Sequence, residues 1–178
     1  MSATDAITLY ARETAGFAER LAAAQATLLE AARTWHPLKQ ASSLGAEDMV
    51  ITHLIDTLGL DIPVFVLDTG ALHSQTLALL DRLRAQRPVE VLRPHAQAVT
   101  AFVQREGTEA MYRSIELRKA CCQLRKLEPL GRALASQRAW ITGLRREQSD
   151  ARAEVPAIDT REPRAKVNPL ADWSWADV

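Results

Sequence analysis

Apolar residues follow two patterns along the chain, one periodic and one continuous. From Phe17 onward they recur every three or four residues, which predicts an amphipathic helix over residues 10–35. The His36-Pro37 step ends this helix, because a residue before proline avoids the helical conformation. The run over residues 63–67 is continuously apolar and rich in β-branched side chains, which predicts a strand buried on both faces of a parallel sheet.

Shorter apolar runs predict further strands, and segments with helical spacing separate them. Strands are expected at residues 89–92 and 139–143, whereas residues 38–40, where another strand is needed, are too polar to assign. Strands that alternate with helices predict an α/β fold with a doubly wound, mostly parallel sheet and right-handed crossovers. The chain is therefore expected to form an N-terminal helical segment, residues 1–37, followed by an α/β domain, residues 38–178.

Two stretches in the second half of the chain complete this outline. Residues 114–128 are expected to form a helix, and Pro129 to open a new one, because proline suits the first helical turn. Residues 172–178 have the pattern of the first turn of a helix rather than of its end. The domain is therefore expected to be incomplete at its C-terminus.

Composition and charge narrow the classes of function. The chain has 178 residues, 22 basic and 22 acidic, so its formal net charge of +0 provides no global attraction to nucleic acid or to an anionic membrane. No stretch reaches the roughly 18 apolar residues of a membrane span, and Met1–Asp5 lack a basic leader. We therefore expect a cytoplasmic protein, in which thiols stay reduced and a disulfide is disfavoured.

Cys121 and Cys122 are the only cysteines of the chain, and they are adjacent. Basic side chains flank the pair and favour the thiolate form that a metal ligand or a nucleophile requires: Arg118, Lys119, Arg125 and Lys126. A [4Fe–4S] cluster takes four thiolates, so the pair is either half of a cluster site or two cysteines that only fill space in the core.

Three polar loops follow the predicted strands and should meet at the carboxyl edge of the sheet, where ligands bind in this class of fold. The first, residues 42–48, has hydroxyl groups and a glycine before a helix, which suit an anion but also an ordinary helix cap. The second, residues 68–70, has a carboxylate and a glycine that suit a ribose hydroxyl. The alternative is an ordinary turn in which Asp68 caps the following helix. The third, residues 143–152, presents arginines whose guanidinium groups match phosphate or sulfate oxygens; the alternative is an ordinary charged loop in contact with solvent. The substrate-binding candidates are Ser42, Ser43, Gly45, Asp68, Gly70, Gly143, Arg145, Arg146, Gln148, Ser149 and Arg152.

Taken together and in this order, the loops and the cysteine segment resemble one enzyme family. The motifs are Ser42–Asp48, Leu67–Gly70, Cys121-Cys122 with Arg125-Lys126, and Gly143–Ser149. They closely resemble the assimilatory adenylyl-sulfate reductases, within the phosphoadenylyl-sulfate reductase family. The resemblance implies a fold like that of the adenine-nucleotide hydrolase-like, PP-loop proteins.

The resemblance also implies an activity and roles for three residues. The family reduces adenylyl sulfate to sulfite and AMP in sulfate assimilation, which leads to cysteine. A thiolate attacks the substrate sulfur, and thioredoxin then releases sulfite from the S-sulfocysteine. Cys121 and Cys122 would supply two of the four ligands of a [4Fe–4S] cluster, and Lys126 would act electrostatically between the cluster and the substrate. Relatives with the cysteine pair mostly use adenylyl sulfate rather than its 3′-phosphorylated form.

The sequence also departs from the family pattern. A second cysteine pair and the nucleophilic cysteine near the C-terminus of family members are missing, so we expect a fragment that is inactive alone. Alternatives are a non-catalytic adenine-nucleotide-binding module, a reductase of the 3′-phosphorylated nucleotide, and a homo-oligomer in which two chains pool their cysteines around one cluster. An ATP pyrophosphatase is disfavoured, because Ala46-Glu47-Asp48 lacks the lysine of that version of the loop.

Overall fold

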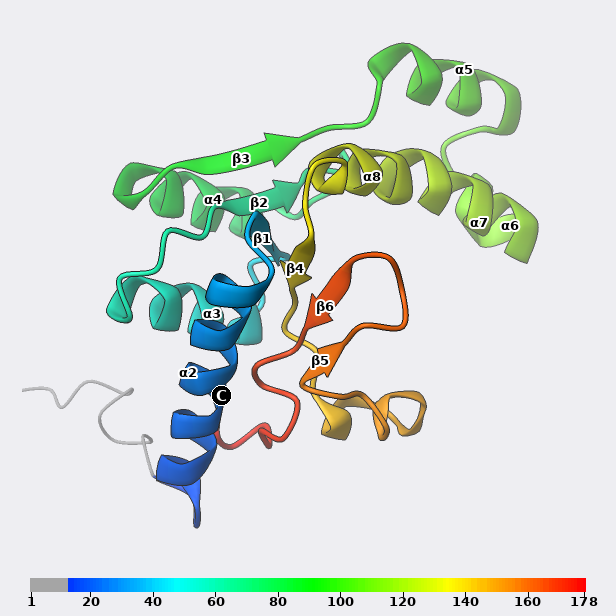
Figure 1. Ribbon diagram of the computed structural model, residues 1–178. Helices are drawn as coiled ribbons and strands as arrows, with labels where there is room; N and C mark the ends of the chain where they lie inside the picture. The colour runs from blue at the N-terminus through cyan, green and yellow to red at the C-terminus, as the bar shows by residue number, and fades with distance from the viewer. Residues whose placement is uncertain (1–12) are drawn as a thin grey trace, which may run out of the picture.

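The computed structural model describes residues 13–178, which form one six-stranded sheet with helices packed against both of its faces (Figure 1). The strand order is β3-β2-β1-β4-β6-β5, and all neighbouring strands are parallel except β5, which is antiparallel to β6. The strands are β1 (Leu38–Ser42), β2 (Val64–Leu67), β3 (Val89–Leu92), β4 (Ala139–Ile141), β5 (Ile158–Asp159) and β6 (Ala165–Val167). The predicted doubly wound, mostly parallel α/β sheet is confirmed.

Helices alternate with the strands, as the pattern predicted. They are α2 (Phe17–Thr34), α3 (Ala46–Thr57), α4 (Ser74–Gln86), α5 (Ala96–Glu106), α6 (Ala110–Arg113), α7 (Ile115–Cys122), the π-helix η1 (Gln123–Leu127), α8 (Glu128–Leu134) and the 3₁₀ turns η2 (Arg146–Gln148) and η3 (Asp150–Arg152). The helix expected over residues 10–35 forms as α2, but it begins at Phe17, because residues 15–16 form a turn before it; residues 10–12 lie outside the part that the structure describes. The helix expected over residues 114–128 forms as α7 and η1, and it continues without a break into α8, so Pro129 lies in the first turn of α8 but does not open a separate helix as expected.

Strand β1 lies in the middle of the sheet, although its sequence was too polar to assign. Leu38, Gln40 and Ser42 point to one buried face, and Gln40 is fully buried. The Gln40 amide donates to the Asp48 carbonyl (2.7 Å) and accepts from Thr52 Oγ1 (3.0 Å). Because its hydrogen bonds are made inside the protein, this amide can be buried at little cost, and it ties β1 to α3.

Strand β2 is buried on both faces, as its continuous apolar run predicted. Successive side chains of a strand point to opposite faces. Val66 packs with Leu80 and Leu83 of α4, whereas Phe65 packs with Ala133 and Leu134 of α8. Helix α8 therefore covers the face of the sheet that carries Phe65, and this face forms one wall of the site described below.

Helix α2 packs in the same core as the sheet. Its buried residues Ala24, Leu28 and Ala31 contact a cluster that includes Ile51 of α3 and Val167 of β6. The described part of the N-terminal segment, residues 13–37, therefore shares its hydrophobic core with the α/β domain, and α2 runs beside the last residues of the chain (Figure 1).

The segment over residues 172–178 forms hydrogen-bonded turns, and no helix is assigned in it. Asp177 accepts hydrogen bonds from the Ser174 amide (2.7 Å) and from Arg20 Nε of α2 (2.9 Å). Phe17 and Trp173 pack edge to face with ring centroids 5.5 Å apart. Ser174 Oγ in turn accepts from the Asp177 amide (3.2 Å), so the two residues form the reciprocal pair of a capping box, which agrees with the expected first turn of a helix, and this turn docks on α2. Among residues 13–178, no helix is long and apolar enough to cross a membrane.

Candidate functional site at the switch point of the sheet

A cavity of about 470 Å³ opens at the carboxyl ends of β1, β2 and β4. The chain runs from β1 outward to β2 and β3 and then crosses to β4 on the other side of β1, so the strand order reverses between β1 and β4. This is where open α/β sheets bind ligands. The predicted site residues that line the cavity are Ser42, Ser43, Lys126, Gly143, Gln148 and Arg152. Gly45, Asp68, Gly70, Arg145, Arg146, Ser149, Cys121 and Cys122 are not among its lining residues.

The loop after β1 turns around the carboxylate of Asp48. The backbone amide and the hydroxyl of Ser43 both donate to Asp48 Oδ2, each at 2.6 Å. Ser42 Oγ accepts from the Leu44 amide (3.1 Å), and Gly45 caps α3 without a side-chain hydrogen bond. The serines therefore shape the loop rather than cap the helix conventionally. Burial raises the pKa of Asp48, and the hydrogen bonds from Ser43 oppose that rise.

Gly143, directly after β4 and Thr142, leaves no room for a side chain. A Cβ at this position would lie 2.6 Å from Asp48 Oδ1 and 2.8 Å from the Glu47 Cβ. The end of β4 thus passes directly over the start of α3, and glycine permits this close approach. The contact brings the first and third predicted loops together at one cavity wall.

Arg145 and Arg146 are bound to other protein groups outside the cavity. Arg145 is 4% exposed, pairs with Glu47 (3.0 Å) and Glu147 (2.8 Å), and lies over the Trp175 ring, 5.6 Å from its centroid. Arg146 donates to the Val155 carbonyl (2.8 Å) and pairs with Asp172.

Two other side chains of the third loop, Gln148 and Arg152, face the cavity instead. Gln148 Nε2 donates to Glu47 Oε1 (3.0 Å), and Gln148 Oε1 accepts from Arg152. Burial acts to raise the pKa of Glu47, but hydrogen bonds from its own backbone, from Gln148 and from Arg145 outweigh it and lower the pKa. Glu47 therefore stays ionised and fixes the loop.

The loop after β2 is held by two arginines. Asp68 accepts from the Gly70 amide (3.0 Å) and from Arg93 Nε (2.8 Å). Burial would raise the pKa of Asp68, but these hydrogen bonds and the charge of Arg93 lower it. Arg125 Nη1 donates to the Thr69 carbonyl (2.8 Å), and Thr69 lines the cavity.

The alternative in which Asp68 caps the following helix is wrong, because α4 begins at Ser74 with His73 before it. Gly70 has a φ of 75°, the left-handed conformation that favours glycine, and a Cβ there would meet Arg125 at 3.4 Å. The sequence did not indicate that Arg125 anchors this loop, since 56 residues separate it from Thr69.

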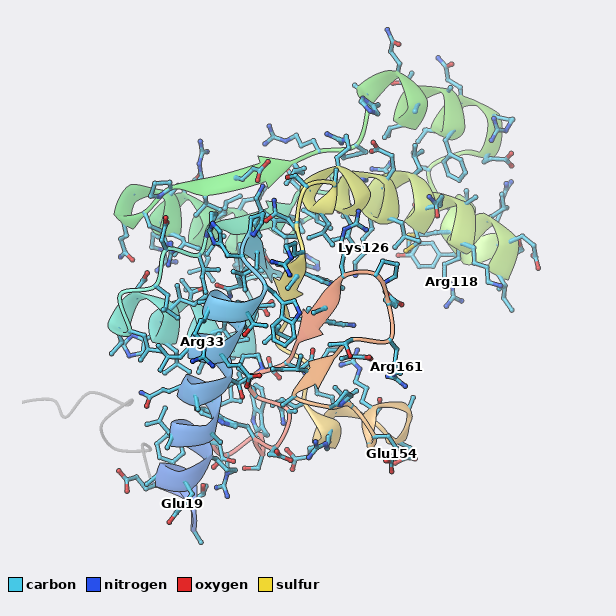
Figure 2. All side chains as sticks on the ribbon, in the orientation of Figure 1. Glu19, Arg33, Arg118, Lys126, Glu154 and Arg161 are labelled. Carbon is cyan, nitrogen blue, oxygen red and sulfur yellow. The ribbon has the colours of Figure 1, made fainter. Side chains whose placement is uncertain are left out.

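The cysteine pair ends α7, and the chain continues directly into the π-helix η1. A π-helix is rare and occurs mostly at functional sites. Its wider turn changes which residues share a face, and Lys126 within it lines the cavity. In Figure 2, Lys126 lies on the side of this helix that faces the β5–β6 loop, whereas Arg118 lies farther along α7.

Cys121 is partly exposed and Cys122 is exposed, and both are free thiols. In the part of the chain that the structure describes, no group of three or more His, Cys, Asp or Glu side chains could hold a metal ion. Thiolates are the ligands that iron–sulfur clusters use. The pair therefore fits two of four cluster positions, and the described residues supply no further thiolate.

Two residues that sequence reasoning did not select complete the cavity. Trp140 of β4 and Lys166 of β6 both line it, and Lys166 Nζ lies 5.0 Å from the Trp140 ring centroid. Nothing in the local sequence singled out a lysine in a three-residue strand. Their pairing depends on the register of β4 and β6, in which Trp140 and Lys166 are partners.

The fold and the cavity define an open, mostly parallel α/β protein with a candidate ligand site at the switch point of its sheet. Residues 37–178 match the family described as phosphoadenosine phosphosulfate reductase domain, and the chain belongs to this family. The resemblance inferred from the sequence motifs is confirmed.

Three curated relatives named adenosine 5'-phosphosulfate reductase are 47–49% identical to this chain over the aligned residues. The protein of Burkholderia cepacia is 48% identical over 170 residues, which cover 93% of this chain and 67% of the relative. That of Allochromatium vinosum is 47% identical over 163 residues, 89% of this chain and 64% of the relative. That of Neisseria meningitidis serogroup B is 49% identical over 143 residues, which are 78% of this chain and 58% of the relative. The chain thus spans about two thirds or less of these relatives.

A solved structure supports the fold. The phosphoadenylyl-sulfate reductase from Candida auris, crystallised as a phosphate complex, superposes with a TM-score of 0.70 at 23% sequence identity. The match covers 93% of this chain and 83% of the other.

Proposed function

We propose that this chain carries the substrate-binding part of a thioredoxin-dependent adenylyl-sulfate reductase, which forms sulfite and AMP in assimilatory sulfate reduction. The observation that carries the proposal is one cavity at the switch point, lined by Ser43, Thr69 and Lys126, with Lys126 on the same continuous helix as Cys121 and Cys122. The names of the relatives support adenylyl sulfate as the substrate. A cytoplasmic location and thioredoxin as the reductant belong to the same proposal.

The cavity residues fit the parts of this substrate. The loop at Ser42 and Ser43 offers hydroxyl and backbone groups, Gln148 and Arg152 offer donors from the opposite loop, and Lys126 offers a positive charge. A thiolate that attacks the sulfur forms an S–S bond to the sulfonate group as the S–O bond to AMP breaks. Negative charge then builds on the departing phosphate, which a fixed cation such as Lys126 stabilises. Two thioredoxin thiols release sulfite from the S-sulfocysteine and become a disulfide.

In this proposal Cys121 and Cys122 hold a [4Fe–4S] cluster together with two thiolates from another segment or a second copy of the chain. If bound, the cluster would supply a charged group held by Cys121 and Cys122 on the helix that also carries Lys126. Both cysteines of the sequence are then ligands, so neither is the attacking nucleophile.

The test of substrate binding is isothermal titration calorimetry on the purified 178-residue chain. We expect binding of adenylyl sulfate and of AMP, and weaker binding of the 3′-phosphorylated nucleotide. Ser43→Ala should weaken binding, whereas Ser136→Ala, an exposed change after α8, should not. Absence of adenylyl sulfate binding to the wild type would falsify the proposal.

A second candidate, a non-catalytic nucleotide-binding module, is favoured by the cysteine count alone. Anaerobic incubation with iron and sulfide distinguishes the two. The reductase proposal predicts a broad visible iron–sulfur absorption, either when the chain forms an oligomer or when a second polypeptide supplies the other two thiolates. This absorption should be lost in Cys122→Ser. Nucleotide binding without cluster formation or thioredoxin-dependent sulfite release under any of these conditions would favour the module.

A further inference from the structure

The cations of the site divide into those that the protein itself neutralises and those that it does not. Arg145 and Arg146, the arginines that the motif suggested for the phosphate, form ion pairs with Glu47 and Asp172, respectively. In contrast, no carboxylate of residues 13–178 forms an ion pair with Lys126 or Lys166. Both of these lysines line the cavity.

The two lysines enter the cavity from different walls. Lys126 comes from η1, which continues into α8, and α8 covers the sheet face that carries Phe65. Lys166 comes from β6 within the sheet. Together with Arg152 of η3, which also lines the cavity and forms no ion pair among residues 13–178, three positive charges therefore border one cavity from elements that are far apart in sequence.

Lys166 forms no ion pair among residues 13–178, although the pKa of Asp159, which hydrogen bonds from Arg161 lower most, is lowered least by the charge of Lys166. Asp159 is its register partner on the neighbouring strand β5, but this carboxylate is bound by Arg161 (2.5 Å). The ammonium group of Lys166 instead lies near the Trp140 ring, whose π face attracts a cation. An aromatic face positions a cation but leaves its charge available to an incoming anion.

We propose that Lys166 is a further cation for the anionic phosphate–sulfate group of the nucleotide, acting with Lys126 and Arg152 and held in place by Trp140. This inference rests on the proposed function, because it assigns a residue to the same cavity. The substrate carries negative charge on both its phosphate and its sulfate, and two separate ammonium groups on flexible stems match two separate anionic groups. Lys166 thereby favours charged adenine nucleotides over the neutral nucleoside.

The test compares ligands that differ only in charge. Calorimetry of adenosine, AMP and adenylyl sulfate is carried out on the wild type, Lys166→Gln, Lys166→Arg and Arg164→Gln. Arg164 is an exposed basic residue next to β6 that does not line the cavity, so its variant is a matched control for the loss of one charge. Since a hydrogen bond to a charged group contributes about 1.5–3 kcal/mol, Lys166→Gln should weaken binding of AMP and adenylyl sulfate roughly tenfold or more. Adenosine binding should be unchanged, and Lys166→Arg should restore much of the loss.

Two results would overturn the role of Lys166. Unchanged nucleotide affinity in Lys166→Gln would show that it does not contact the anion. An equal loss for adenosine and the nucleotides would show a purely structural role. If the wild type bound none of the adenine ligands, the proposed function itself would fail, and the inference would fail with it. If the wild type binds adenylyl sulfate and Lys166→Gln binds it equally well, the role of Lys166 is rejected and the proposed function stands.

Discussion

Gly143 lies against Asp48 so closely that a Cβ on Gly143 would come within 2.6 Å of Asp48 Oδ1. The glycine follows β4 and the aspartate lies in the first turn of α3, so their contact joins the two sides of the switch point. Asp48 in turn accepts both hydrogen bonds of Ser43. The shape of the serine loop therefore depends on the absence of a side chain 100 residues away in sequence.

Gly143→Ala should both destabilise the protein and weaken nucleotide binding. Overpacking a well-filled site typically costs about 1–3 kcal/mol, and here the added methyl group displaces the carboxylate that organises the Ser43 loop. Urea unfolding and AMP titration measure the two effects. The matched control is Gly131→Ala in α8, where nothing lies within 4 Å of an added Cβ. It should be neutral or stabilising by roughly 0.5–1 kcal/mol, and an equal loss in both variants would contradict this account.

Arg145→Ala and Arg152→Ala should have different effects. Arg145 is buried and pairs with the partly buried Glu47, so its removal leaves this carboxylate without its partner, a change that should cost about 1–3 kcal/mol. Arg152 lines the cavity, so its removal should lower nucleotide affinity and leave the melting temperature nearly unchanged. Thermal unfolding and calorimetry distinguish them. If the two variants lost stability and nucleotide affinity to the same extent, Arg145 would not be the structural residue and Arg152 would not be the ligand-binding one.

Arg125→Gln should weaken nucleotide binding by releasing the loop after β2. The lost hydrogen bond from Arg125 to the Thr69 carbonyl is charge-assisted, so an effect of about 1–3 kcal/mol on binding is expected. Arg118→Gln is the control, because Arg118 is exposed on α7 and no hydrogen bond of its side chain is recorded among residues 13–178 (Figure 2). Equal affinities of the two variants would reject the anchoring role of Arg125.

Asp177 should make stability depend on acidity. Hydrogen bonds from Arg20, Thr14 and Ser174 hold its pKa well below the usual range, although burial opposes this. A carboxyl group with a lowered folded-state pKa contributes stability above its unfolded pKa and loses it as the pH falls. Asp177→Asn should therefore melt below the wild type at neutral pH and approach it in acid. Exposed Asp61→Asn is the control, and a gap that stays constant from pH 7 to pH 3 would argue against this contribution.

The fold could be predicted where the hydrophobic pattern was decisive. The apolar run of β2 and the periodic spacing of α2 were sufficient, because burial on two faces or on one stripe imposes those patterns on the sequence. Strand β1 could not be predicted, since the buried position 40 is occupied by glutamine. Its amide is satisfied by Asp48 and Thr52 of α3, which are partners that exist only after folding.

The site could be predicted only in part. Ser42, Ser43, Gly143, Gln148, Arg152 and Lys126 were candidates from the motifs, and all six line the cavity. Arg145 and Arg146 carried the same motif signal, but residue type alone does not reveal that carboxylates occupy them. Lys166 and Trp140 carried no signal, because their proximity is a consequence of strand register.

The sequence by itself determined the class of fold, the family and the presence of a cysteine pair with basic neighbours, because periodicity and ordered motifs are properties of the chain. The tertiary structure decided which charges remain available to a ligand. That depends on distances between residues from β1, η1, β4 and β6, and the charge of a cation is neutralised only by groups within a few ångströms of it. The same structure showed that a π-helix connects the cysteine pair to Lys126 at the cavity, a change of helical pitch that the residue pattern did not reveal.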